Sequence, residues 1–226
     1  MQSLRSITLF AGLAADVVAR AEAACRWHER SSGELVIDQK DTSTDVYFLT
    51  KGRARVVVYS SSGKAVAFRE IKAGDMFGEL AAIDGKPRSA AIEALETCQF
   101  ASMSAIDFQR LATDEPSVLK SLLGHLVGLV RGLSDRVYEF GTLAVANRIH
   151  AELLRLARGS AIDGARARIT PAPKHADIAA LVGTHREAVA REFSRLRRMG
   201  LVERKGSALI IMDLEQLRLM VVGHND

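Results

Sequence analysis

The spacing of apolar residues changes along the chain and predicts helical and β-rich regions in turn. Between residues 7 and 30, apolar side chains such as Phe10, Leu13 and Val17 recur at helical intervals, so we expect one helix there. From about residue 34 to 104, short β-rich runs alternate with turns that contain Gly, Asp or Ser. These runs predict strands over residues 34–37, 46–49, 54–59, 66–71 and 90–94. Short strands in regular succession are typical of an all-β barrel or jelly roll, whose mouth can hold one ligand.

A long helix is predicted from about residue 116 to 136, continuing to 143. Pro116 suits the first turn of a helix, and the acidic Asp114 and Glu115 precede it. The apolar residues of this helix follow one another mostly in steps of three and four, at Leu119, Leu122, Leu126, Val130, Leu133, Val137 and Phe140. This is the spacing of a two-stranded coiled coil, but a single helix packed on its own domain shows a similar pattern, so both interpretations stay open.

The C-terminal part has the pattern of a winged helix-turn-helix. A helix is predicted over residues 146–158, a loop over 159–164, a short strand over 166–170, and two further helices over 175–182 and 184–199. Gly183 stands between the last two, where the end of a helix needs a left-handed residue. Thr184 and Glu187 match a capping box for the second of them. Two apolar runs around Lys205 and Gly206 predict a β-hairpin wing.

The second helix of this pair carries side chains suited to DNA. A helix-turn-helix places the N-terminal residues of its second helix against base edges in the major groove. Here these residues are His185, Arg186, Glu187 and Arg191. Arg is the usual bidentate partner of guanine, and a Glu carboxylate can accept a hydrogen bond from cytosine N4. A small helical bundle with incidental basic residues is the alternative.

Charge is distributed unevenly along the chain. Residues 1–144 hold 17 Lys and Arg against 18 Asp and Glu, whereas residues 145–226 hold 14 against 9, within a net charge of +4. A basic C-terminal part is what a nucleic-acid-binding module needs, although a solvated basic face would give the same counts.

Composition narrows the class of protein further. The 226 residues are 48% hydrophobic, which supports a substantial core, and no apolar run reaches the ~18 residues needed to span a bilayer. The N-terminus lacks the pattern of a signal peptide. Cys25 and Cys98 lie far apart without CxxC spacing, which argues against a cysteine-bound zinc site or an iron–sulfur cluster. We therefore expect a reduced, cytoplasmic protein with no membrane partner.

Residues 77–89 carry the most distinctive polar groups of the β-rich region. Glu79, Arg88 and Ser89 offer a carboxylate, a guanidinium and a hydroxyl, and flexible Gly78 precedes them. Arg88 can bind a phosphate with two charge-assisted hydrogen bonds, and Ser89 with nearby backbone N–H groups can complete that site. Glu79 would be repelled by a phosphate, so we expect it to accept from a hydroxyl such as a ribose 2′-OH. A surface turn with an exposed Glu–Arg pair is the alternative.

These parts, in this order, resemble the cyclic AMP receptor protein (CRP)/FNR family of bacterial transcription regulators from about residue 8 onward. Two motifs carry the resemblance: the recognition segment over residues 183–191, and the phosphate cassette Gly78-Glu79-Leu80-Ala81 followed by Arg88-Ser89. The resemblance implies an α+β fold in three parts. They are a β-roll (jelly-roll) cyclic-nucleotide-binding domain over residues 1–115, a dimerisation helix over 116–143, and a winged helix-turn-helix DNA-binding domain over 144–226.

The resemblance also implies how the ligand is bound. Glu79 would bind the ribose hydroxyl, and Arg88, helped by Ser89, would bind the cyclic phosphate. The other cassette residues in the ligand site are Gly78, Leu80 and Ala81. The base contact falls on Leu133 and Ser134 of the long helix, where the cyclic AMP receptor has a Thr-Ser pair. We expect cyclic AMP as the effector. Because Leu133 cannot form a hydrogen bond with the base, cyclic GMP stays open as an alternative.

The partners implied by the resemblance are a second copy of the chain, double-stranded DNA, a cyclic nucleotide and RNA polymerase. The residues expected to read a TGTGA-type half-site of a pseudo-palindromic operator are Arg186, Glu187 and Arg191, and the other DNA-binding residues expected are Thr184 and His185. No prosthetic group is expected, although a haem-sensing or ligandless family member stays open. An enzyme that hydrolyses the nucleotide is a further alternative, but we find no metal-ligand cluster, activated nucleophile or acid–base pair for catalysis.

Overall fold

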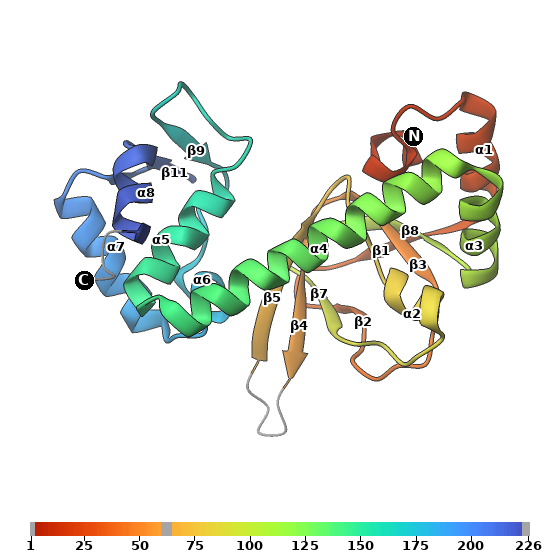
Figure 1. Cartoon of the computed structure of the whole chain (residues 1–226), viewed down its shortest axis with the longest axis horizontal. Coiled ribbons are helices and arrows are strands. Elements are labelled where there is room, and N and C mark those ends of the chain that lie inside the picture. Colours follow the sequence, from red (N-terminus) through yellow and green to blue (C-terminus); the bar gives the residue numbers. More distant parts are fainter. Residues whose placement is uncertain (1–2, 60–64, 223–226) are drawn as a thin grey trace. The chain divides into compact units, whose positions relative to one another are not determined.

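The computed structural model describes residues 3–59 and 65–222, and the chain divides into two compact units. The first unit comprises Met1–Val130 and the second Arg131–Asp226. Helix α4 (Pro116–Thr142) begins in the first unit and ends in the second (Figure 1). Each unit has its own buried apolar core, so each is described on its own.

Two four-stranded antiparallel sheets form the framework of the first unit (Figure 1). The sheet ordered β1-β8-β3-β6 consists of β1 (Cys25–Arg30), β3 (Val46–Lys51), β6 (Met76–Phe77) and β8 (Cys98–Met103). The sheet ordered β2-β7-β4-β5 consists of β2 (Leu35–Ile37), β4 (Arg53–Tyr59), β5 (Ala65–Lys72) and β7 (Ala91–Ala94). The five predicted strands are therefore found as β2, β3, β4, β5 and β7, with ends shifted by at most two residues.

The first unit is held together by two clusters of buried apolar side chains. One takes residues from both sheets, including Leu49 and Phe100 of the first sheet and Ile71 and Ile92 of the second, and so lies between them. The other joins the first sheet to its helices, and in it Phe48 packs against Phe10 and Phe108 with ring centroids 5.2 and 6.5 Å away. Those helices are η1 (Leu4–Ser6), η2 (Thr8–Phe10), α1 (Ala15–Ala23), α3 (Ala105–Asp114) and the first turns of α4.

The single helix predicted over residues 7–30 is wrong except in its middle. Helix α1 covers only Ala15–Ala23, because Gly12 adopts a left-handed φ of +78° before it and the chain becomes strand β1 after it. Strand β1 pairs with β8 at six successive positions, from Cys25 with Met103 to Arg30 with Cys98. This long-range pairing overrides the local helical spacing, and neither β1 nor β8 was predicted.

The second unit is a winged helix-turn-helix, as predicted (Figure 1). Its helices are α5 (Val145–Leu156), α6 (His175–Val182), α7 (Arg186–Arg198) and α8 (Leu214–Val222), of which α8 was not predicted. Strands β9 (Ala167–Ile169), β10 (Val202–Lys205) and β11 (Ala208–Ile211) form a sheet of order β10-β11-β9. Lys205 pairs with Ala208 across the wing, and Gly206 in the turn has a φ of +58°. One apolar core packs the helices on this sheet.

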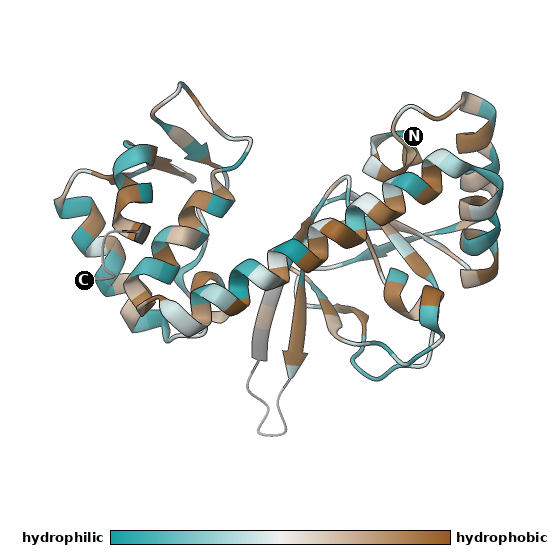
Figure 2. Cartoon of the chain, in the orientation of Figure 1, coloured by the Kyte–Doolittle hydropathy of each residue, from teal (hydrophilic) through white to brown (hydrophobic). Residues whose placement is uncertain are grey.

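Helix α4 exposes a line of apolar side chains. Figure 2 shows hydrophobic residues recurring along the ribbon of this helix. Leu122, which we expected on this line, instead packs in the core of the first unit and is 5% exposed, while Leu123 is 55% exposed. When Leu123 replaces Leu122, the spacing alternates strictly between four and three residues. The resulting line is Leu119, Leu123, Leu126, Val130, Leu133, Val137 and Phe140, of which Leu126 is partly buried against the core of the first unit. Val127, next to Leu126, is 53% exposed. In the structure this pattern is closer to a coiled-coil seam than the sequence pattern suggested.

Candidate functional site

The expected phosphate cassette begins at a glycine that no other residue can replace without strain. Gly78 follows strand β6 with a left-handed φ of +83°, and helix α2 (Glu79–Asp84) starts directly after it. A Cβ at this position would lie 2.9 Å from Arg88 Nη1 and 3.0 Å from the Asp45 carbonyl oxygen. The glycine therefore allows both the turn into α2 and the close approach of Arg88.

Arg88 is buried, with 5% of its surface exposed, and its guanidinium is held by uncharged groups. Its Nη1 donates to the Gly78 carbonyl oxygen at 2.9 Å, and its Nη2 donates to that of Asp45 at 2.8 Å. Its Nε donates to Ser43 Oγ at 3.2 Å. Among the described residues it forms no ion pair with a carboxylate. A buried guanidinium without an anionic partner is suited to attract an anion such as a phosphate.

Glu79 is the second buried charged residue of the cassette, and its partner is His125 on α4. His125 Nε2 lies 3.5 Å from Glu79 Oε1. Burial raises the pKa of Glu79, but the neighbouring His125 ring, the backbone N–H of Glu79 and the charge of Arg69 outweigh it, so the pKa falls below its ordinary value of 4.5. Glu79 is therefore ionised at neutral pH, and either of its carboxylate oxygens can accept a hydrogen bond from a ligand hydroxyl.

The remaining residues expected to bind the ligand differ in how far they are exposed. Ala81 is buried in α2, Leu80 is 46% exposed on the same helix, and Ser89 is exposed after Arg88. Leu133 and Ser134 are exposed on the part of α4 that belongs to the second unit. The structure thus brings Gly78, Glu79 and Arg88 together, and the base contact by Leu133 and Ser134 stays a prediction.

Several neighbours of the cassette were missed by sequence reasoning. Ser43, Asp45 and Tyr47 surround Arg88, whose guanidinium lies 5.6 Å from the centre of the Tyr47 ring. They precede Arg88 by some 40 residues and carry no motif of their own. His125 was also missed, because it follows Leu122 by three residues on the helix and the sequence pattern placed Leu122 on the exposed line and not in the core.

The expected DNA-reading residues lie at the start of α7. His185, Arg186, Glu187 and Arg191 are exposed, while Val189, Phe193 and Leu196 of the same helix are buried in the core. Of the described residues, none forms a hydrogen bond or ion pair with the side chains of Arg186, Glu187 or Arg191. These three side chains are therefore available to a partner.

The capping box predicted from Thr184 and Glu187 is not formed. Helix α7 begins at Arg186 with His185 as its N-cap, and no side chain caps it. Thr184 instead remains in the turn, where its backbone N–H donates to the Ala179 carbonyl oxygen at 3.0 Å. That hydrogen bond closes the C-terminus of α6, and α7 starts two residues later than predicted, with His185 in place of Thr184 as its N-cap.

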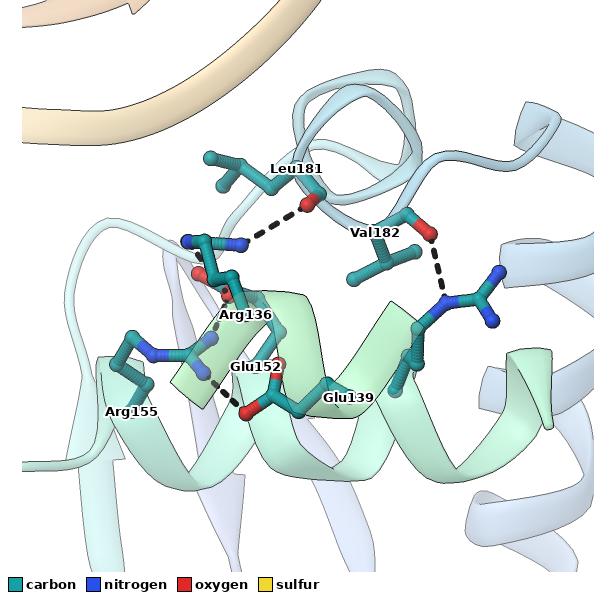
Figure 3. Close-up of polar contacts among 7 residues, drawn as sticks. Arg136, Glu139, Glu152, Arg155, Leu181 and Val182 are labelled. Atoms are coloured by element: carbon teal, nitrogen blue, oxygen red, sulfur yellow. Dashed lines mark hydrogen bonds and ion pairs between the residues drawn. The ribbon is translucent and has the colours of Figure 1, made fainter. Parts of the chain in front are cut away.

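Buried charges hold the end of α6, which leads into this turn (Figure 3). Arg136 on α4 donates through Nη1 to the Leu181 carbonyl oxygen at 2.9 Å and through Nη2 to Glu152 Oε2 at 3.2 Å. Arg155 also donates to Glu152, and to Glu139 Oε1 at 2.5 Å. Burial lowers the pKa of Arg136, although the Glu152 carboxylate opposes this shift. Arg136 thus donates a hydrogen bond to one of the carbonyl groups that the end of a helix leaves without a backbone partner.

The next carbonyl of α6 is bound by Arg148 of α5. Its Nε donates to the Val182 carbonyl oxygen at 3.0 Å and its Nη1 to that of Leu143 at 2.8 Å (Figure 3 shows the first). Its guanidinium lies 5.1 Å from the centre of the Phe140 ring, and that ring in turn covers Gly183. Gly183 has the predicted left-handed conformation, with φ of +64° and ψ of 45°. The last turns of α4 therefore belong to the framework that sets the turn before α7.

A second buried pair joins α5 to α7. His150 Nε2 lies 2.6 Å from Glu192 Oε1, and Arg195 also donates to Glu192 at 2.8 Å. Burial lowers the pKa of His150 below 6.5 despite the attraction of Glu192. Burial raises the pKa of Glu192, but Arg195 and His150 outweigh it and the pKa is lowered. A neutral His150 donating to an ionised Glu192 fits these directions, and this hydrogen bond fixes the buried side of α7.

Comparisons with known proteins match a region in each of the two units to a known domain family. Residues 28–115 match the family model of the cyclic nucleotide-binding domain, and residues 147–220 match that of the Crp-like helix-turn-helix domain. The cAMP-activated global transcriptional regulator CRP of Salmonella typhimurium is 28% identical over 192 residues, which cover 83% of this chain and 90% of the relative. The cAMP-activated global transcriptional regulator Vfr of Pseudomonas aeruginosa is 25% identical over 195 residues, covering 83% and 89%.

Solved structures show the same fold. A CooA mutant from Carboxydothermus hydrogenoformans has a TM-score of 0.80 at 18% identity, covering 97% of this chain and 96% of that one. FixK2 from Bradyrhizobium japonicum has a TM-score of 0.76 at 20% identity, covering 86% and 96%. Within the described residues no helix is long and apolar enough to cross a membrane. The matched relatives are transcription regulators and not enzymes. The chain belongs to the CRP/FNR family of cyclic-nucleotide-binding, DNA-binding transcription regulators.

Proposed function

We propose that this protein is a homodimeric transcription regulator that binds cyclic AMP and then a pseudo-palindromic operator with TGTGA-type half-sites. The observation that carries the proposal is the pair of buried charges in the cassette. Arg88 has no carboxylate partner among the described residues, and Glu79 is an ionised acceptor that directly follows Gly78, whose carbonyl oxygen accepts from Arg88. An anionic phosphate ester with a free sugar hydroxyl complements both groups.

In this proposal each cassette residue has one task. Arg88 binds the cyclic phosphate with the guanidinium N–H groups that its three protein acceptors leave free, and the exposed Ser89 hydroxyl assists. Glu79 accepts from the ribose 2′-OH. Gly78, Leu80 and Ala81 shape the backbone around the ligand.

The base is the part of the ligand that the chain specifies least. Leu133 offers only apolar contact, and Ser134 offers one hydroxyl. A single hydroxyl can serve either purine, since adenine and guanine both carry donors or acceptors on the edge it would meet. We propose cyclic AMP because the curated relatives are named as cAMP-activated regulators, and cyclic GMP or another or no effector is the alternative.

The second copy of the chain is proposed to bind along α4. The exposed seam of this helix alternates in steps of four and three residues, and its most exposed members are Val130 and Val137 at 63% and 73%. A parallel pair of such helices would bury these side chains against each other. A two-fold symmetric dimer then presents two α7 helices to two half-sites, and the operator repeats with the same symmetry.

DNA recognition is proposed to use the free side chains at the start of α7. Arg186 and Arg191 can each pair with a guanine, and Glu187 can accept from cytosine N4. We assign contacts with the phosphate backbone to Thr184 and His185, which precede α7. RNA polymerase is the proposed partner once the dimer is on DNA. The nucleotide must bind the DNA-competent state better than the other state if it is to activate the protein.

The proposal is tested by calorimetry followed by DNA binding. The purified protein is titrated with cyclic AMP and with cyclic GMP, and binding to a duplex with two TGTGA half-sites is then measured by gel shift with each nucleotide. We expect saturable binding of cyclic AMP and a tighter complex with the duplex in its presence. Binding of cyclic GMP alone would replace the effector, and DNA binding of equal strength with and without either nucleotide would contradict a nucleotide-responsive regulator.

A further inference from the structure

The first unit contains a buried histidine nitrogen that the protein itself does not satisfy. His125 Nε2 is shielded from solvent and has no hydrogen-bond partner among the described residues. The nearest polar atom given for it is Glu79 Oε1, 3.5 Å away, which is long for a good hydrogen bond. Buried polar atoms almost always have a partner, so an unsatisfied one beside a ligand-binding residue points to a group supplied from outside.

The two side chains offer complementary hydrogen-bonding groups. Glu79 is ionised and can only accept, so the Nε2 that faces it carries a hydrogen and donates. One hydroxyl oxygen can lie within hydrogen-bond distance of two atoms 3.5 Å apart. A hydroxyl donates its own hydrogen to the carboxylate and accepts from the imidazole N–H. A phosphate oxygen would be repelled by Glu79, and an ammonium group has no lone pair for His125.

We propose that His125 is a second sugar-binding residue, which donates from Nε2 to the same ribose 2′-hydroxyl that donates to Glu79. This inference rests on the proposed function, because it takes a cyclic nucleotide as the ligand. It assigns to α4 a polar contact with the sugar within the first unit, at a position eight residues before Leu133. The ligand then contacts α4 by hydrogen bonding even though Leu133 gives no hydrogen bond to the base.

A purely structural role for His125 makes a different prediction. In that case the histidine only balances the charge of Glu79 and holds its side chain in place, together with the charge of Arg69 from β5. Removal of His125 would then act through Glu79 alone. If Glu79 were already replaced, removal of His125 would have no further effect on sugar recognition.

The experiment compares cyclic AMP with 2′-deoxy-cyclic AMP by calorimetry. For the intact protein, His125→Leu and His125→Gln, we expect His125→Leu to weaken cyclic AMP binding about tenfold and to leave the deoxy analogue within about twofold. His125→Gln keeps an N–H donor and should recover part of the loss. Lys120→Gln, an exposed change on the same helix, serves as the control and should match the unmodified protein.

The Glu79→Gln variant separates direct binding from positioning. In the Glu79→Gln protein, His125→Leu should still weaken the binding of cyclic AMP several-fold more than the binding of 2′-deoxy-cyclic AMP. No further loss there, or an equal loss for both nucleotides in the first experiment, would overturn the role of His125 and leave the proposed function intact. If the protein prefers cyclic GMP, the same comparison is made with that nucleotide and its 2′-deoxy form. If the unmodified protein binds neither nucleotide, the proposed function and this inference both fail.

Discussion

At the level of single residues, Arg88 is expected to contribute to the fold and to ligand binding through the same guanidinium group. Arg88 is expected to bind phosphate, yet its guanidinium also holds the carbonyl oxygens of Gly78 and Asp45. Arg88→Leu should therefore remove nucleotide binding and also destabilise the first unit by about 1–3 kcal/mol, because two buried acceptors lose their donor. Arg88→Lys keeps the charge but not the fork, so it should bind nucleotide at least about tenfold more weakly than the unmodified protein.

Calorimetry and urea unfolding on the same samples measure the two effects of these Arg88 variants separately. Arg88→Leu with unchanged nucleotide affinity would contradict the phosphate role, whatever its stability. Arg88→Leu with unchanged stability would contradict the structural role.

Gly183 shows that a glycine can be required for two separate reasons. It has a φ of +64°, and a Cβ on it would lie 2.7 Å from Phe140 Cε1. Gly200 in the same unit has a φ of +71° but has no atom within 4 Å of the equivalent Cβ. Gly200→Ala should therefore cost only the backbone strain of about 1 kcal/mol, and Gly183→Ala should cost more because the Phe140 ring must move. Urea midpoints of the two variants measure the difference, and equal midpoints would show that the ring moves at no cost.

At the level of elements, α4 combines the core of one unit with an exposed seam. Leu122 faces inward and Leu123 outward, although the two are adjacent and of the same residue type. Leu123→Glu should therefore leave the fold intact and convert a dimer into a monomer, because it places a charge on the seam of each chain. Light scattering after gel filtration measures the mass, with Lys120→Glu as the control off the seam. A dimeric Leu123→Glu variant would place the interface elsewhere.

The elements that could be predicted from sequence are those whose signals lie within the element or at its ends. Strands bounded by Gly and Asp turns, and helices closed by a residue such as Gly183, carry their signals locally and were found. Strand β1 was missed because its residues alternate weakly and its structure depends on β8, which lies some 70 residues later. The contact of His125 with Glu79 likewise needs the packing of α4 on the first unit, and no local pattern states which residue the inward face of a helix will meet.

At the level of the whole molecule, the histidines and glutamates with lowered pKa values change the stability in the same direction with pH. Burial lowers the pKa of His28, His150 and His175 below 6.5, and hydrogen bonds and charges lower the pKa of Glu79 and Glu192 below 4.5 against the effect of burial. An unfolded chain takes up protons on these groups at a higher pH than the folded chain does. The free energy of unfolding should therefore fall from pH 6.5 downward through the histidines, and again below pH 4.5 through the carboxylates.

His150 should dominate the first of these two steps, because its side chain is 1% exposed whereas those of His28 and His175 are partly open to solvent. We expect the urea midpoint of the second unit to fall between about pH 7.5 and about pH 5.5, and His150→Gln to reduce that fall. Glutamine keeps an N–H donor for Glu192 but takes up no proton, so the comparison concerns the slope and not the midpoint itself. If His150→Gln kept the full slope, the acid sensitivity would have to arise from groups other than the buried contact between α5 and α7.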